Sequence, residues 1–191
     1  SLDPPPAGLL GSLTLLASAA GGLIFAVIAD RYGRARALMG SIIIYSVFTA
    51  ACGFAQTVPQ LAVFRVFLGI GMGGEWASGA ALVSETWSTE HRGKALGFMQ
   101  SSWALGYGAA AIVTALVMPL WGWRGGFFVG VLPALFTIWV RRNVKEPEIW
   151  TQNRGDRASG GLGFAVIFGR DIRRVTIVVT LMNACTMFAW W

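Results

Sequence analysis

The stretch "RVFLGIGMGGEW", which begins at Arg65, places that arginine and Glu75 in an apolar run rich in glycine. Gly69, Gly71 and Gly74 have the G-x-G-x-x-G spacing of a dinucleotide-binding loop, in which backbone N–H groups cradle a pyrophosphate. In a membrane helix, the same two charges would instead bind a polar solute or carry a proton, because ionisable groups in a bilayer are costly and usually functional. The surrounding elements decide between these two chemistries.

The uncharged stretches of the chain are too long for a soluble core. Of the 191 residues, 55% are hydrophobic and only 13% are charged, whereas a soluble domain has about 25% charged residues. A membrane-spanning helix needs about 20 apolar residues and a strand only about five or six. We therefore predict an all-α, polytopic transmembrane bundle, and the nucleotide-binding enzyme is disfavoured. Six hydrophobic segments are expected, over residues 8–29, 37–55, 59–84, 94–118, 123–140 and 174–191.

Two turns between these segments are marked by proline and glycine. Pro59 is suited to the first turn of the third segment, and Pro119 with Gly122 marks a turn between the fourth and fifth. The basic residues alternate with these turns. Apart from Arg65 and Arg124, every Lys and Arg lies in one of three loops, at 31–36, 92–94 and 141–174.

This alternation of basic loops follows the positive-inside rule and predicts that all three are cytoplasmic. The net charge of +6 and the pI near 10.2 therefore point to membrane orientation. A nucleic-acid partner is disfavoured, because no basic stripe interleaves with aromatic residues outside the apolar segments. Cys52 and Cys185 lie in apolar segments and His91 is the one histidine, so we predict no disulfide, no metal site and no cofactor.

Four motifs carry a resemblance to a known family. "ADRYGRAR", from Ala29 to Arg36, resembles the loop signature between the second and third helices of the major facilitator superfamily, with Ala26 where the family has glycine. "RVFLGIGMGGEW" resembles its fourth-helix motif. "SETWSTEHRGKALGF" and "RRNVKEPEIW" are similar to the fourth-to-fifth loop and the post-sixth-helix segment of its sugar and metabolite porters. On these motifs the chain is identified as a member of that superfamily.

The resemblance implies a domain organisation. Residues 1–140 would form an N-terminal transmembrane bundle holding helices two to six, with helix one missing. Residues 141–173 would form a cytoplasmic loop between the two halves, and 174–191 a truncated helix seven. The protein would be a multi-pass protein of the cell inner (plasma) membrane, and its partners would be the lipid bilayer, a small-molecule substrate, a proton and the missing parts of the same chain.

Charged residues near two of the basic loops suggest a conformational latch. The arginines after Asp30 can pair with it or with helix C-terminal carbonyls, and Glu85 can pair with Arg92 one loop later. Such a cluster could hold one state of an alternating-access carrier. The alternative is a set of solvated charges that only sets topology. The predicted latch residues are Asp30, Arg31, Arg34, Glu85 and Arg92.

Arg65 and Glu75 are the first candidates for substrate binding and proton coupling. They are separated by about 15 Å of helix rise, so each needs its own partner. The resemblance suggests a first-helix acid as the partner of Arg65, and the alternative is an arginine that snorkels to the interface near Pro59. The "GGEW" form resembles metabolite:proton symporters and sialic acid porters, in which Glu75 would gain and lose a proton. Alternatively, Glu75 is a structural hydrogen-bonding group.

The fifth helix of the family supplies a second stripe. Gln100, Trp103 and Tyr107 recur at i, i+3 and i+7, and the resemblance places Gln100 where sugar porters bind substrate. Tyr107 lies one helical repeat later, where these porters often have a polar amide, and this departure disfavours a sugar substrate. Aromatic core packing is the alternative for Trp103. Asn183 on the last segment is a further candidate.

These patterns predict a secondary transporter rather than an enzyme. Proton-coupled import of a small organic anion, such as a carboxylate or a sialic-acid-like solute, or of a polar metabolite is favoured. The helix "SSWALGYGAAAIVTAL" lacks the Gly-Pro motif of drug:proton exporters, which disfavours efflux. The alternatives are a sugar facilitator or sugar:proton symporter and, from another class, a non-transporting membrane solute sensor.

Overall fold

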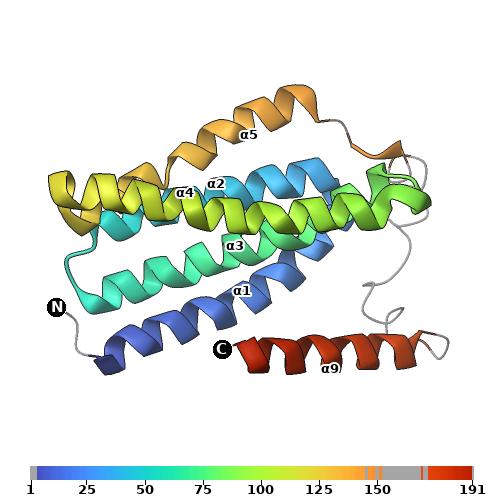
Figure 1. The fold of residues 1–191 in the computed structure, drawn as a ribbon, viewed down its shortest axis with the longest axis horizontal. Coiled ribbons are helices and arrows are strands. Elements are labelled where there is room, and N and C mark those ends of the chain that lie inside the picture. Colours follow the sequence, from blue (N-terminus) through green and yellow to red (C-terminus); the bar gives the residue numbers. More distant parts are fainter. Residues whose placement is uncertain (1–3, 145, 149–150, 152–168, 170–171, 191) are drawn as a thin grey trace. The chain divides into compact units, whose positions relative to one another are not determined.

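The computed structural model describes residues 4–144, 146–148, 151, 169 and 172–190. Among these residues, helices are the only regular secondary structure. The predicted all-α class is confirmed. The chain divides into two compact units, at 1–153 and 154–191. The helices of the first unit are α1 (Pro4–Tyr32), α2 (Arg34–Phe54), α3 (Val58–Thr86), α4 (Thr89–Val129) and α5 (Leu132–Asn143), and the second unit contains α9 (Arg173–Trp190) (Figure 1).

Helix boundaries follow the local chemistry of the turns. α3 begins after Thr57, whose side-chain oxygen accepts a hydrogen bond from the backbone N–H of Gln60, and Pro59 lies in its first turn as expected. α4 contains a non-helical residue, Gly122, with a φ of 64°, and the yellow ribbon reverses direction there in Figure 1. A positive φ is readily adopted only by glycine. The predicted turn at Gly122 is therefore confirmed.

The helix expected over 123–140 is interrupted. Its first part ends at Val129, and α5 begins at Leu132 after a turn at Gly130 and Val131. Pro133 has no N–H to donate to the carbonyl of residue 129, which favours a break in the helix at this point. After the turn at Gly122 the chain packs back on α2, with the rings of Phe54 and Phe128 edge to face at 4.9 Å between centroids.

Four helices are long and apolar enough to span a bilayer, by length and composition. They cover Gly8–Tyr32, Arg34–Phe54, Val58–Thr86 and Thr89–Gly122. The shortest has 21 residues, which gives about 31 Å of helix against a hydrocarbon core of about 30 Å. The predicted segments at 123–140 and 174–191 are not among the four found in the described residues. The first is split by the turn before Pro133, and α9 has only 18 residues and begins with two arginines.

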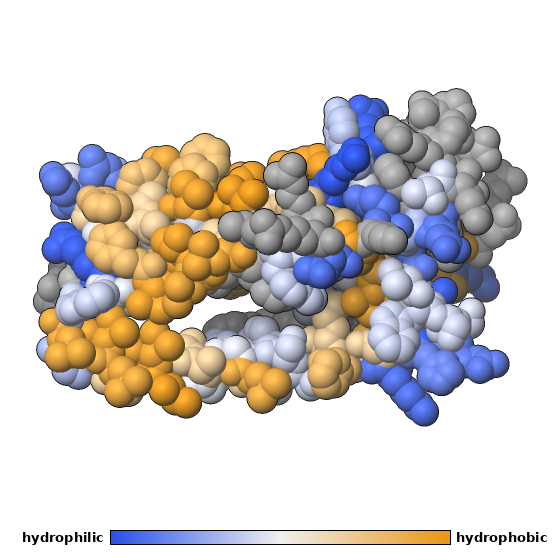
Figure 2. Space-filling view, turned by 90° about the horizontal axis from the view of Figure 1, so that it is seen from above, coloured by the Kyte–Doolittle hydropathy of each residue, from blue (hydrophilic) through white to orange (hydrophobic). Residues whose placement is uncertain are grey.

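Successive helices of the first unit run in opposite directions. The α1–α2 turn, the α3–α4 turn and the end of α5 lie at one end of this unit, on the right in Figure 1. The α2–α3 turn and the yellow bend of α4 lie at the other end. On the face in Figure 2, hydrophobic residues predominate left of the middle, with a few hydrophilic ones at the far left edge, and most hydrophilic residues gather toward the right. The first two basic loops therefore share one end of the bundle.

Glycines let α3 lie directly against two neighbouring helices. A Cβ atom at Gly69 would collide with the backbone carbonyl oxygen of Thr14 on α1, and one at Gly73 with that of Ser18. On the other side, a Cβ at Gly71 would lie 2.6 Å from the backbone nitrogen of Tyr45 on α2. Helix backbones in membranes approach this closely only where side chains are absent. The glycine spacing that resembles a dinucleotide loop thus belongs to helix packing.

We predict that Gly73→Ala destabilises the protein by about 1 to 3 kcal/mol, because its methyl group would meet the backbone of α1. Gly106→Ala is the matched control, since Gly106 is also helical but nothing lies within 4 Å of its added Cβ. Thermal unfolding of the purified protein in detergent measures both. Equal melting temperatures for the two variants would contradict the close packing of α1 and α3.

We predict that the two ends of the bundle face opposite sides of the membrane. Gln56, between α2 and α3, and Lys94, near the start of α4, are both exposed, and the α2–α3 turn and the start of α4 lie at opposite ends of the bundle (Figure 1). A cysteine at Gln56 should react with an impermeant thiol reagent on intact cells, and a cysteine at Lys94 should react only after permeabilisation. A parent with Cys185 replaced by serine gives the background, because Cys52 is buried. Labelling of the Lys94→Cys variant on intact cells would reverse the predicted orientation.

Candidate functional site

A cavity of about 990 Å³ opens within the first unit. It lies between the first four helices, and it is lined by residues within 18–22 of α1, 38–45 of α2, 72–83 of α3 and 99–103 of α4. Its lining residues are Ser18, Ala19, Gly22, Leu38, Ile42, Tyr45, Met72, Gly73, Glu75, Trp76, Ala77, Gly79, Leu82, Val83, Met99, Ser102 and Trp103.

Helical spacing on α3 explains which side chains face this cavity. Met72, Glu75, Trp76 and Gly79 lie at positions i, i+3, i+4 and i+7 and so share one face. The packing glycines described above lie mostly on the other faces, against α1 and α2. Helix contact on one side therefore fixes Glu75 and Trp76 on the cavity side.

The cavity combines one carboxylate with aromatic and apolar walls. Among the described residues that line the cavity, Glu75 is the only acidic one, and none is Lys, Arg or His. Tyr45, Trp76 and Trp103 supply aromatic surface from three helices. Such a site offers stacking and apolar contact to a ligand, with few groups for hydrogen bonding.

The structure brings together only part of the predicted binding set. Glu75 and Trp103 line the cavity. Tyr107 reaches it only through Trp103, since their rings meet edge to face at 4.7 Å between centroids. Gln100 is exposed on α4 and is not a lining residue. Met99 and Ser102, the neighbours of the predicted stripe, face the cavity instead.

Sequence reasoning missed several lining residues. Trp76 directly follows Glu75, and its interval of four residues from Met72 placed it on the same helical face. Tyr45 carries no comparable signal, because its segment is apolar in every direction and nothing in the sequence marks the face that meets α3. Ser18 lies among several small residues on the first segment, which by themselves indicate helix packing and not a binding site.

Arg65 lies elsewhere on α3. It is partly buried, and its Nε atom is buried without a hydrogen-bond partner among the described residues. Its guanidinium carbon lies 6.0 Å from the centroid of the Phe127 ring, at the outer limit of a cation–π contact. Asn183 lies on α9 in the second unit, and its side chain is outside the described part of the structure.

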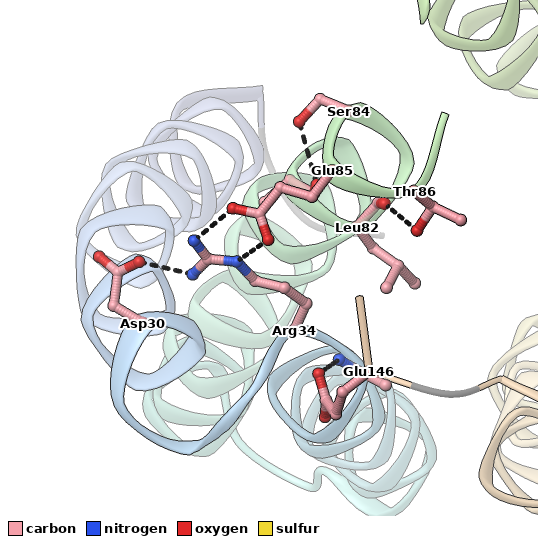
Figure 3. A network of polar contacts seen from close by, with 9 residues as sticks. Asp30, Arg34, Leu82, Ser84, Glu85, Thr86 and Glu146 are labelled. Atoms are coloured by element: carbon pink, nitrogen blue, oxygen red, sulfur yellow. Dashed lines mark hydrogen bonds and ion pairs between the residues drawn. The ribbon is translucent and has the colours of Figure 1, made fainter. Parts of the chain in front are cut away.

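A polar cluster at the end of the bundle joins three helices. Arg34, at the start of α2, binds Glu85 of α3 through two parallel contacts, Nε to Oε2 at 3.0 Å and Nη2 to Oε1 at 2.7 Å. Its Nη1 donates to Oδ1 of Asp30 on α1 at 2.6 Å (Figure 3). The Arg34 side chain is 8% exposed and that of Glu85 18%, so the contacts between these two are largely shielded from water, whereas the Asp30 side chain is 50% exposed. A planar guanidinium suits this two-sided pairing.

A fourth residue, Glu146, belongs to the C-terminal part of the first unit and lies beside this cluster. Its two carboxylate oxygens accept hydrogen bonds from the backbone N–H groups of Ala35 and Arg36, at 3.1 and 3.2 Å. These N–H groups belong to the first turn of α2, which has no partner within its own helix and attracts negative charge. Gly33 leaves room for this contact, because a Cβ there would collide with the Glu146 carboxylate.

The predicted latch is assembled differently from the expectation. Asp30, Arg34 and Glu85 do meet, but Glu85 pairs with Arg34 where we expected Arg92. The Nε atom of Arg92 is buried without a hydrogen-bond partner among the described residues, and Arg31 is exposed. In the sequence, Glu146 stands out only as part of the motif "RRNVKEPEIW". Its role as a helix cap depends on a contact 111 positions away in sequence.

Comparisons with known proteins agree with this arrangement. A sequence model of the Major Facilitator Superfamily matches residues 1–191. A probable 4-methylmuconolactone transporter from Cupriavidus pinatubonensis is 39% identical, over 96% of this chain and 45% of that protein. The sialic acid transporter NanX from Escherichia coli is 33% identical, over 97% of this chain and 45% of that protein. The chain thus spans less than half the length of these relatives.

A solved structure shares the fold. The xylose transporter XylE from E. coli, in an inward-open conformation, superimposes with a TM-score of 0.67 and 20% identity. The match covers 96% of this chain and 46% of that chain. At this identity the similarity shows the arrangement of the helices alone.

The third prediction concerns the polar cluster. Arg34→Ala should destabilise the protein by about 3 kcal/mol, because it leaves Glu85 partly buried without its cation. Arg31→Ala is the matched control and should cost less than about 1 kcal/mol, since Arg31 is exposed. Chemical denaturation in detergent compares the two. Similar losses for both variants would show that the cluster does not stabilise the bundle.

Proposed function

The chain belongs to the Major Facilitator Superfamily, a family of membrane transporters and not of enzymes, and from this we propose that it imports a small organic acid together with a proton. Transport would proceed by alternating access across the inner (plasma) membrane. The cavity beside Glu75 is the observation that carries this proposal.

The size and lining of the cavity support a small, partly apolar substrate. Its volume of about 990 Å³ falls within the range of about 300 to 1,000 Å³ that is typical of ligand pockets. Tyr45, Trp76 and Trp103 offer aromatic surface for an unsaturated or cyclic carbon skeleton. The substrate therefore needs apolar surface as well as a polar group.

An acid fits this lining better than a sugar. Each hydroxyl of a buried sugar requires a hydrogen-bond partner, and an unpaired one is costly. Besides Glu75, the described lining offers hydrogen-bonding side chains from Ser18, Tyr45 and Ser102, and the indole N–H groups of Trp76 and Trp103. The names of several relatives, among them the transporters of 4-methylmuconolactone, sialic acid and cis,cis-muconate, also favour an organic acid.

Glu75 is the proposed carrier of the proton. It lies within a membrane-spanning segment, and no cationic side chain lines the described cavity around it. A charged carboxylate in such surroundings is costly, so a carboxyl that takes up and releases a proton suits the site. Arg65, Gln100, Tyr107 and Asn183 remain proposed contributors to coupling or substrate binding, outside this cavity lining.

The Arg34 cluster is proposed to stabilise one conformation during transport. It ties α1, α2 and α3 to Glu146, so these helices would move as one body. The predicted cytoplasmic loop at 141–173 begins next to this cluster, although most of its residues lie outside the described part of the chain. Its cytoplasmic location is part of the proposal.

Uptake measurements on the complete encoded protein test the substrate class. Cells that express it are given radiolabelled 4-methylmuconolactone, sialic acid, benzoate, nicotinate or xylose, with and without a protonophore. We expect at least one acid to accumulate, and the protonophore to abolish that accumulation. Accumulation of xylose alone would favour a sugar transporter, and binding without flux into vesicles would favour a sensor.

The fourth prediction isolates Glu75. Glu75→Gln should abolish accumulation against a gradient but spare exchange of labelled for unlabelled substrate, because only net symport requires the carboxyl to gain and lose a proton. Glu90→Gln, at an exposed position in the first turn of α4, is the matched control and should accumulate normally. Proton-driven accumulation at the wild-type level in Glu75→Gln, at equal expression, would remove Glu75 from the mechanism.

A further inference from the structure

Gly79 differs from the other glycines of α3. Those four would each bring an added Cβ within 3.0 Å of atoms on α1 or α2, and they are Gly69, Gly71, Gly73 and Gly74. At Gly79, the nearest atom among the described residues is Cδ1 of Leu38, at 4.0 Å, which is an ordinary van der Waals contact. Packing between the described helices therefore does not require a glycine at this position.

A glycine inside a helix needs another reason, because it destabilises the helix relative to alanine. Gly79 lies inside α3, which ends at Thr86, and it lines the cavity. The space that its missing side chain leaves is therefore part of the cavity. Gly79 enlarges the cavity without bringing α3 any closer to α1 or α2.

A side chain at position 79 would extend into this space. In an α-helix, each Cα–Cβ bond is tilted toward the N-terminus, so a side chain covers the turn before its own residue. The turn before Gly79 carries Glu75 and Trp76, which both line the cavity. Any larger residue at position 79 would therefore occupy the part of the cavity beside Glu75.

The cavity lining is apolar beyond Gly79. Leu82 and Val83 follow it on α3, and Leu38 contacts it from α2. Leu82 and Val83 come seven and eight positions after Glu75, which corresponds to about 10 to 12 Å along the helix axis. None of these three side chains can donate or accept a hydrogen bond. This end of the cavity suits the carbon skeleton of a ligand.

Two hydroxyl groups of the lining belong to residues toward the other end. Ser18 packs against α3 at Gly73, and Tyr45 packs against it at Gly71. Both glycines precede Glu75 on α3, whereas Gly79 follows it. Because a polar group is costly to bury without a partner, a ligand would place its polar group on the Glu75 side and its apolar part beside Gly79.

We propose that Gly79 limits the size of the substrate, because the apolar part of the acid lies against the backbone of α3 at this residue. This assignment rests on the proposed function and identifies a residue that selects among organic acids. A larger side chain at position 79 would take the place of this apolar part, so the cavity would accept only smaller acids.

Displacement of a bound acid from the complete purified protein tests this assignment. The bound acid is the radiolabelled one that accumulates most in the uptake panel, and the competitors are benzoates with hydrogen, methyl, ethyl or butyl para to the carboxylate. In Gly79→Leu, the inhibition constant of the largest benzoate that binds the wild-type protein should rise about tenfold or more, because the cavity is overpacked. That of the smallest should change much less, and Gly79→Ala should lie between. Gly106→Ala is the matched control, since Gly106 is equally open but outside the described lining.

Thermal unfolding separates the size of the cavity from helix packing. Gly79→Ala should melt no lower than the wild-type protein, because alanine favours the helix and its methyl group meets no described atom closer than 4.0 Å. Gly73→Ala should melt lower. A melting temperature of Gly79→Ala as low as that of Gly73→Ala would show that Gly79 is needed for packing, and this would overturn the proposal.

A further measurement needs no bound acid. Leu38→Cys, in the parent with Cys185 replaced by serine, is labelled with methyl and with benzyl methanethiosulfonate. When Gly79→Leu is added, labelling by the benzyl reagent should slow more than labelling by the methyl reagent, because less space remains beside residue 38.

The outcomes distinguish this assignment from the proposed function. If all the benzoates lose affinity by the same factor in Gly79→Leu while the wild-type protein accumulates an acid, Gly79 does not select by size and the proposed function stands. If fewer than two benzoates displace the acid from the wild-type protein, the labelling decides, and equal slowing of both reagents overturns the proposal. If no acid accumulates or binds, the proposed function fails, whereas unequal labelling would still support Gly79 as the residue that limits the cavity.

Discussion

The close approach of α3 to α1 and α2 is the constraint on which the rest of the first unit depends. Gly69 and Gly73 place its backbone against the backbone of α1, and Gly71 does the same toward α2. Any side chain at these positions would push the helices apart and rotate α3. Its remaining face, which carries Glu75 and Trp76, would then no longer meet α4 across the cavity. The lack of side chains at these glycines thus determines the direction in which Glu75 and Trp76 point.

The cavity and the polar cluster share this rigid helix. Glu75 and Glu85 are ten residues apart on α3, which corresponds to about 15 Å along the axis. A tilt of α3 that changes the cavity must also displace Glu85 relative to Arg34. Because their two contacts are directional and largely shielded from water, the cluster favours one orientation of α3. The two sites are therefore mechanically linked without any chain of intervening side chains.

The sequence predicted much of this fold because bilayer constraints leave a simple pattern. Four long apolar helices, the turn at Gly122 and the helix start near Pro59 follow from charge-free length and from proline and glycine chemistry. The break before Pro133 was missed because the apolar pattern runs through it. Within the site, Glu75 and Trp103 could be predicted because a charge or a large ring is unusual in such helices.

Other parts of the site could not be predicted, because they depend on contacts between helices. Hydrophobic periodicity is weak in a helix that is apolar on all sides, so neither Tyr45 nor the choice of Met99 and Ser102 over Gln100 could be read from one segment. The pairing of Glu85 with Arg34 likewise depends on how α2 and α3 meet, whereas the sequence favoured the nearer Arg92.

The cap that Glu146 forms on α2 has a consequence for biosynthesis. Ala35 leaves the ribosome 111 residues before Glu146, and at about 5 to 20 residues per second that interval lasts roughly 5 to 20 s. Throughout it, the first turn of α2 has backbone N–H groups that only water or lipid headgroups can satisfy. Helices α1 to α3 can insert during this time, but the end of the bundle is completed only when the segment after α5 has been made. A residue made near the end of the first unit thus completes the hydrogen bonding of the first turn of α2.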